Sequence, residues 1–215
     1  MGLDMKRTIF PLMACVAGLG ALSGCVSTGM ARTVDPGELQ VSVSGGIQGN
    51  VGYIPQGELA VRYGVSERVD VGARLFLPGV EVDTRVALLR SPSLKSGVDV
   101  TLAPSLAFVV PITSASSALV FPSLPLLVGV NLNGSQLVLG PRVGYVINTG
   151  QPPTSQTFAN NFVVGSSLGL AIPVGQAFRV VPEVSLLHRV GTTFGSSTTA
   201  LHGGVGLIFG GYAEE

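Results

Sequence analysis

Apolar and polar residues alternate with a period of two along much of this chain, and this pattern restricts the fold more than any other feature of the sequence. It is clearest at 55–65, 68–77 and 80–90, where apolar residues alternate with polar, charged or small ones. Successive side chains of a β-strand point to opposite faces, so this period indicates strands whose two faces meet different surroundings. No apolar stripe of helical period appears after residue 24. The pattern therefore predicts an all-β fold.

The same alternation continues, with less polar contrast, over most of the later chain. Short turn signals such as Ser66-Glu67-Arg68 and Asn133-Gly134-Ser135 alternate roughly with longer polar links. This arrangement predicts ten strands, at residues 37–46, 55–65, 68–77, 80–90, 98–110, 118–132, 136–148, 160–173, 177–190 and 198–210.

The composition points to a membrane rather than to water. Charged residues make up only 11% of the chain and the mean hydropathy is +0.54, whereas about 25% charged residues is usual for a soluble domain. Yet no uninterrupted apolar run after the N-terminal segment is long enough for a membrane helix. An even number of strands of about ten residues, joined by tight turns at one end and longer loops at the other, is typical of an outer-membrane β-barrel. We therefore predict a single antiparallel up-and-down membrane barrel of about ten strands over residues 37–212.

The segment from Tyr63 to Leu75 adds a specific likeness. It resembles a hairpin that is common in small outer-membrane barrel proteins. The resemblance implies a barrel in the cell outer membrane, whose exterior contacts lipid and whose assembly uses the outer-membrane insertion machinery. It singles out no ligand, and it implies a structural, small-solute or surface-interaction role.

Charged strand residues fall almost entirely on one face of the predicted strands. In lipid the sheet must close on itself, so this face would line the lumen. A lipid-facing Arg near the membrane midplane would cost roughly 2–4 kcal/mol, which makes chance sorting a poor explanation. Acids and arginines are nearly balanced, so a narrow lumen would hold an ion-paired network. The predicted lumen residues are Glu58, Arg62, Asp70, Arg74, Glu81, Asp83, Arg85, Asp99, Arg142, Arg179 and Glu183.

Proline residues weigh against closure of this sheet. Proline lacks the N–H that a strand donates, and it belongs on edges, at strand ends or at bulges. The alternative is a lipid-tethered soluble β-barrel or β-sandwich in the periplasm, with the apolar face as its core, acting as a binding or assembly protein. The prolines that lie inside predicted strands are Pro104, Pro122, Pro125, Pro141, Pro173 and Pro182.

The N-terminus is built like a bacterial export signal. Lys6 and Arg7 precede an apolar run from Ile9 to Leu22, which is shorter than the roughly 20 residues of a membrane helix. Leu22-Ser23-Gly24-Cys25 then resembles the lipobox of bacterial lipoproteins. The resemblance implies cleavage after Gly24, acylation of Cys25, and handling by the lipoprotein processing and sorting machinery. Residues 1–24 would be the signal peptide and 25–36 a lipidated tether.

Cysteine usage agrees with this interpretation. Cys15 lies in the apolar run and would leave with the signal, so Cys25 would have no disulfide partner in an exported protein. Several acyl chains together make a nearly permanent membrane anchor, because each buried CH₂ contributes roughly 0.8 kcal/mol. The expected location is the cell outer membrane, with lipid anchoring after export.

The sequence carries no convincing catalytic, cofactor or metal motif. His188 and His202 are the only histidines, no Gly-x-Ser-x-Gly motif is present, and His188 falls on the apolar face. The net charge is zero and no basic run occurs, so no nucleic-acid partner is expected. We predict no enzyme and no cofactor. A barrel enzyme acting on lipids remains the third interpretation.

Overall fold

A computed structural model describes residues 29–49, 54–77, 79–110, 118–149, 161–175, 178–190 and 199–212. The predicted signal peptide, its cleavage site and Cys25 lie outside these residues. Among the described residues there is no helix long and apolar enough to cross a membrane.

Twelve strand elements make up the fold, and each pairs with its neighbours in antiparallel fashion. They are β1 (Leu39–Gly49), β2 (Ile54–Ser66), β3 (Val69–Phe76), β4 (Gly79–Leu89), β5 (Ser96–Leu102), β6 (Ser105–Val109), β7 (Leu119–Leu132), β8 (Ser135–Leu139), β9 (Arg142–Asn148), β10 (Asn161–Val174), β11 (Phe178–Val190) and β12 (Thr199–Gly210).

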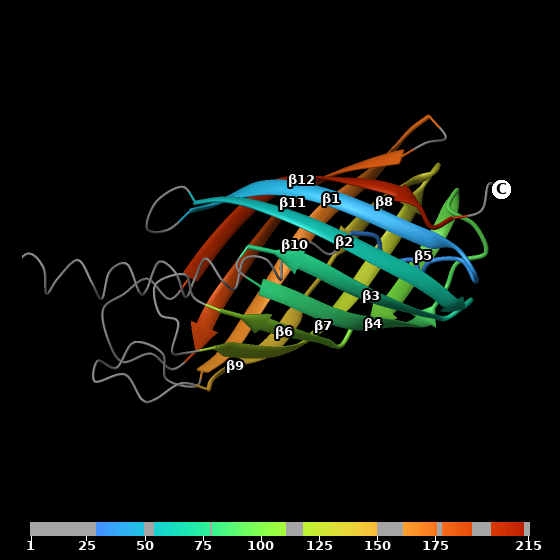
Figure 1. The fold of residues 1–215 in the computed structure, drawn as a ribbon. Coiled ribbons are helices and arrows are strands. Elements are labelled where there is room, and N and C mark those ends of the chain that lie inside the picture. The colour runs from blue at the N-terminus through green and yellow to red at the C-terminus, as the bar shows by residue number, and fades with distance from the viewer. Residues whose placement is uncertain are drawn as a thin grey trace, which may run out of the picture.

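The sheet closes into a barrel of ten strands. β5 and β6 both lie between β4 and β7, and β8 and β9 both lie between β7 and β10, so each of these pairs forms one interrupted strand. β1 closes the ring, because Val43 lies opposite Leu59 of β2 and also opposite Leu207 of β12. The barrel is seen from the side in Figure 1. The predicted all-β class, closure and strand number are confirmed.

Two prolines mark the interruptions instead of opening the sheet. Pro104 stands between β5 and β6, and Pro141 stands between β8 and β9. Their carbonyl groups still accept hydrogen bonds from the neighbouring strands, from Thr84 N at 3.1 Å and from Leu126 N at 2.8 Å respectively. Because a proline can accept but not donate, the ladder loses a donor at each break and keeps its acceptor. The prolines therefore do not prevent closure.

The outer surface of the barrel is apolar, and the inside holds buried charged and amide side chains. Each of the twelve elements exposes at least one large apolar side chain, and Leu59 and Leu201 are 49% and 52% exposed. Buried Gln40, Asp70 and Asp99 point inward instead. A soluble barrel or sandwich needs the apolar face as its core, so this polarity contradicts that alternative.

The two ends of the barrel differ. We call the end with the connections 67–68, 90–95 and 133–134 the turn end; β1 begins there and β12 ends there. The opposite loop end has an apolar interior, which the sequence analysis did not anticipate. Phe76 and Phe121 are its largest side chains and are 6% and 1% exposed. This loop-end apolar layer consists of Phe76, Ala107, Val109, Leu119, Phe121, Val146, Val163, Leu187 and Ala200.

The segment before β1 lies inside the barrel. Residues from Met30 to Val34 are between 0% and 7% exposed, and they contact residues of the barrel wall from Asp70 to Tyr212. We call residues 29–35 the N-terminal plug. The sequence predicts a tether over 25–36, and the structure differs: its described part packs in the lumen as part of the barrel body. Local sequence could not reveal this, because partners of residues 29–35 such as Asp70 and Tyr212 lie far away in the chain.

Candidate functional site in the barrel lumen

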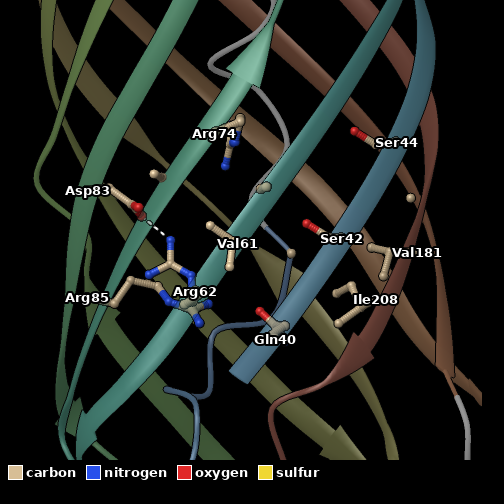
Figure 2. Close-up of a pocket in the computed structure, with 14 residues that line it drawn as sticks. Gln40, Ser42, Ser44, Val61, Arg62, Arg74, Asp83, Arg85, Val181 and Ile208 are labelled. Carbon is tan, nitrogen blue, oxygen red and sulfur yellow. Dashed lines mark hydrogen bonds and ion pairs between the residues drawn. The ribbon is translucent and has the colours of Figure 1, made fainter. Parts of the chain in front are cut away.

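All eleven predicted lumen residues lie on inward-facing strand positions, and the structure joins four of them into one cluster. Arg62 forms ion pairs with Asp70 and with Asp83, and Arg85 Nη2 lies 2.8 Å from Asp70 Oδ2. Figure 2 shows Arg62 of β2 reaching Asp83 of β4, with Arg85 beside it. This ion-pair cluster brings together three neighbouring strands, as the alternation predicted.

Asp70 is the centre of the ion-pair cluster. Its side chain is fully buried and accepts hydrogen bonds from Arg62, from Arg85 and from the backbone N–H of Val34 at 2.8 Å. A buried carboxylate is tolerated only when it is paired and its lone pairs are satisfied. The cluster meets this condition, and one of its donors comes from the N-terminal plug.

A second group of charges lies farther toward the loop end. Arg74 Nε is 3.7 Å from Glu58 Oε2, and Arg74 lies opposite Glu81 in the β3–β4 register. Glu58 and Glu81 are 8% and 5% exposed. Glu81 Oε2 has no hydrogen-bond partner among the described residues. Glu183 and His202 line a neighbouring cavity together with Glu58. This part of the lumen is therefore less completely paired than the ion-pair cluster.

Asp99 departs from the predicted ion pairing. Its carboxylate accepts hydrogen bonds from Ser91 N at 2.7 Å, Asn131 Nδ2 at 2.8 Å and Gln136 Nε2 at 2.8 Å. These donors are neutral, so Asp99 organises an amide network and not a salt bridge. The remaining predicted residues are Arg142, which is 4% exposed, and Arg179, whose guanidinium carbon lies 4.9 Å from the centroid of the Tyr212 ring in a cation–π contact.

Several lumen residues escaped the sequence analysis. Gln136 and Thr101 are uncharged and buried. Only their positions on the inward-facing side of the strands could have identified them as lumen residues. Arg90 follows β4 and forms an ion pair with Asp35 of the plug. Tyr212 follows β12 and its hydroxyl donates to Arg32 O at 3.2 Å. Burial raises the pKa of Tyr212 above its usual value, so the hydroxyl keeps its proton.

Three cavities among the described lumen residues are small, with volumes of about 40, 20 and 30 Å³. The largest of these three is lined by Gln40, Ser42 and Ser44 of β1 and by Arg62 and Arg74 (Figure 2). Because one water needs roughly 10–15 Å³ of such volume, each cavity holds a few waters at most. These cavities are too small for an organic solute.

The histidines lie in separate places. His188 is exposed on the outer face, as predicted, and its Nδ1 lies 2.9 Å from Thr199 Oγ1. His202 is 9% exposed and faces the lumen, where a side chain at Gly46 would overlap its ring. Within the described residues no group of three histidine, cysteine or acidic side chains could hold a metal ion.

No known protein family matches the sequence, and no curated protein is similar to it. Solved structures with a similar arrangement exist. The translocator domain of the autotransporter NalP from Neisseria meningitidis is 11% identical, with 94% of this chain and 97% of that chain covered and a TM-score of 0.42. The outer membrane enzyme PagL is 9% identical, with 79% and 98% covered and a TM-score of 0.39. The outer membrane protein OprG from Pseudomonas aeruginosa is 10% identical, with 86% and 100% covered and a TM-score of 0.35.

This chain is a closed ten-stranded β-barrel. That conclusion rests on its strand pairing. The TM-scores are below 0.5 and the identities are near 10%, so these likenesses assign neither a family nor an activity to the chain.

Proposed function

We propose that this chain is an outer-membrane β-barrel protein with a structural or surface-interaction role and a lumen that is closed at rest. The observation that carries the proposal is the polarity of the wall: large apolar side chains on the outside of every strand element, and buried charges and amides inside. A closed barrel leaves no unpaired backbone edge, which is what a lipid environment requires of strands. An apolar exterior around a polar lumen is the arrangement of transmembrane barrels.

The closed lumen favours a structural role over solute transport. The N-terminal plug is buried in the turn-end half, and the loop-end apolar layer is buried at the other end. The cavities between them hold only a few waters. We also propose no catalytic role for His188 or His202, since one faces outward and the other is packed in the wall beside Gly46.

The proposal also includes a lipid anchor at the N-terminus. The lipobox-like Leu22-Ser23-Gly24-Cys25 supports cleavage before Cys25 and acylation of its thiol and amino group. The partners would then be the lipoprotein processing and sorting machinery, the barrel insertion machinery and the membrane lipid itself.

The experiment separates an integral barrel from a tethered soluble domain. Cys25→Ser removes the anchor, and membranes from cells that make this variant are washed with carbonate and then with urea. An integral barrel stays in the outer-membrane fraction, because its exterior contacts lipid. Release of folded protein into the supernatant would contradict the proposal. Measuring lipid A and phospholipid composition with His202→Ala tests the enzymatic alternative, and we expect an unchanged profile.

A further inference from the structure

The N-terminal plug is held by side chains of the barrel that bind its backbone. Asp70 accepts from Val34 N at 2.8 Å, and Gln136 Oε1 accepts from Ala31 N at 2.7 Å. Thr101 Oγ1 donates to Ala31 O at 2.6 Å, and Arg85 donates to Met30 O. The Tyr212 hydroxyl donates to Arg32 O. These groups, on β3, β4, β5 and β8 and after β12, bind the backbone of the plug. Side chains of the plug add contacts of their own: Arg32 Nη1 donates to Ser91 O at 3.0 Å, Thr33 Oγ1 donates to Glu67 O at 2.9 Å, and Asp35 forms an ion pair with Arg90.

The barrel itself orients these groups. Gln136 Nε2 donates to Asp99 Oδ2 and to Asn131 Oδ1, both at 2.8 Å, which turns its Oε1 toward Ala31 N. Asn131 in turn donates to Asp99 Oδ2 at 2.8 Å. Because the amide network fixes the acceptor through other barrel residues, the site is built by the wall and not by the segment that occupies it.

The shape of the wall also matches the plug. A Cβ at Gly64 would overlap the carbonyl oxygen of Asp35 and lie 2.8 Å from Val34 O. A Cβ at Gly129 would lie 2.8 Å from the Ala31 Cβ and 2.6 Å from Cδ of Gln136, the residue that binds Ala31 N. The buried side chains of the plug are accommodated as well: Met30 packs with Ala171, Val181 and Ile208, and Ala31 packs with Ala103, Leu127 and Val138. Small wall residues thus leave room for one peptide segment.

We propose that the turn-end half of the lumen is a binding site for the backbone of a short peptide, that residues 29–35 occupy it in cis, and that a peptide of the same sequence can occupy it in trans once they leave. The loop-end apolar layer lies on the far side of the lumen. The proposal concerns the interior of the barrel and does not depend on the membrane in which the barrel lies.

Protection from trypsin reports whether the plug is seated. Arg32 is 7% exposed, and a protease cannot reach the bond after it inside the lumen. Lys95 lies in an exposed connection and serves as the internal control. The full chain, produced without acylation and folded in detergent, should be cut after Lys95 at least ten times faster than after Arg32.

Two glycine variants on β2 test the fit of the wall. Gly64→Ala should release the plug and make the bond after Arg32 at least ten times more sensitive to trypsin. Gly57→Ala should leave it protected, because nothing lies within 4 Å of a Cβ at Gly57. Gly129→Ala repeats the test from β7 if Gly64→Ala does not fold, with strand content by circular dichroism as the criterion of folding. Rapid cleavage after Arg32 in the unaltered folded chain, or equal protection in all variants, would overturn the proposal.

Binding in trans is tested with a chain whose own plug cannot enter the lumen. Ala31→Glu places a carboxylate beside Leu127 and Val138, so the plug is excluded while the wall stays unchanged. A fluorescent synthetic peptide of residues 29–36 should bind this variant, with a rise in anisotropy. The same peptide with glutamate in place of Ala31 should not bind the Ala31→Glu chain. The unaltered chain should bind at least ten times more weakly, because its site is occupied. No binding to a folded Ala31→Glu chain would refute the peptide site and leave the proposed membrane role standing.

Discussion

Asp70 and Arg85 form a buried ion pair across the β3–β4 register, with Arg85 Nη2 at 2.8 Å from Asp70 Oδ2 and Arg85 Nε within 3.2 Å of both carboxylate oxygens. Arg62 adds a second cation to the same carboxylate. Because both arginines depend on Asp70, removing this one negative charge leaves two buried positive charges without their shared partner.

We therefore expect Asp70→Asn to lower the free energy of unfolding by roughly 3–5 kcal/mol, the usual cost of breaking a buried pair. Asp83→Asn is the matched control, since Arg62 would keep its contact with Asp70. Urea titration of the two variants in the same micelles measures the difference. Equal losses would contradict the central place of Asp70.

Arg74→Gln should also destabilise the barrel, because it removes the cation next to Glu58 and opposite Glu81. Arg90 is not a neutral comparison, although it follows β4 at the rim, because it pairs with Asp35 of the plug. The exposed turn residue Arg68 is a better control. In thermal unfolding followed by circular dichroism, Arg68→Gln should unfold close to the unaltered chain and Arg74→Gln at a lower temperature. The same unfolding temperature for both would argue against a structural role of Arg74.

The free-energy cost of an arginine on the outer face should depend on how deep the position lies in the bilayer. Val43 lies in the middle of β1 and Leu39 at its turn end, and they are 47% and 53% exposed. In a bilayer Val43→Arg should cost roughly 2–4 kcal/mol and Leu39→Arg about 0–1 kcal/mol. Folding titrations in lipid vesicles measure both. A cost that is small and equal at the two positions would indicate that water, not lipid, surrounds the barrel.

We expect the plug and the loop-end apolar layer to close the lumen in series. Ala31→Glu should empty the turn end, and Phe121→Ala should open space at the loop end, where Phe121 is 1% exposed. Each single variant should leave a planar bilayer nearly non-conducting, since the other closure remains. The double variant should conduct ions. Full conductance in either single variant would show that one closure alone seals the barrel.

The proposed acylation of Cys25 would compete with seating of the plug. Cys25 stands four residues before Gly29, which is about 14 Å at full extension, and Gly29 lies in the lumen, where a side chain would touch Ile208. Cavities of about 40 Å³ cannot hold acyl chains. We expect Cys25→Ser to lose lipid labelling and to gain trypsin protection at Arg32 relative to the acylated protein. Normal labelling of the variant would refute the anchor, and unchanged protection would refute the competition.

The alternation of residues was enough to predict the strands, and the inward phase was enough to predict the charged lumen. The weaker contrast of the later strands has a physical cause: inward positions of β7 such as Leu119, Phe121 and Leu127 are themselves apolar. The loop-end apolar layer therefore could not be distinguished from the outer face. The plug was missed for another reason. Many of its contacts use backbone atoms, which every residue has, and its side-chain partners, such as Ser91 for Arg32 and Arg90 for Asp35, lie far away in the sequence.

The binding groups of the plug span almost the whole chain, from Asp70 on β3 to Tyr212 beyond the last strand. They converge only when β12 has paired with β1 and the ring is complete. The full set of contacts that holds the plug therefore exists only in the closed barrel, and a plug with all of them in place reports that the first and last strands have paired.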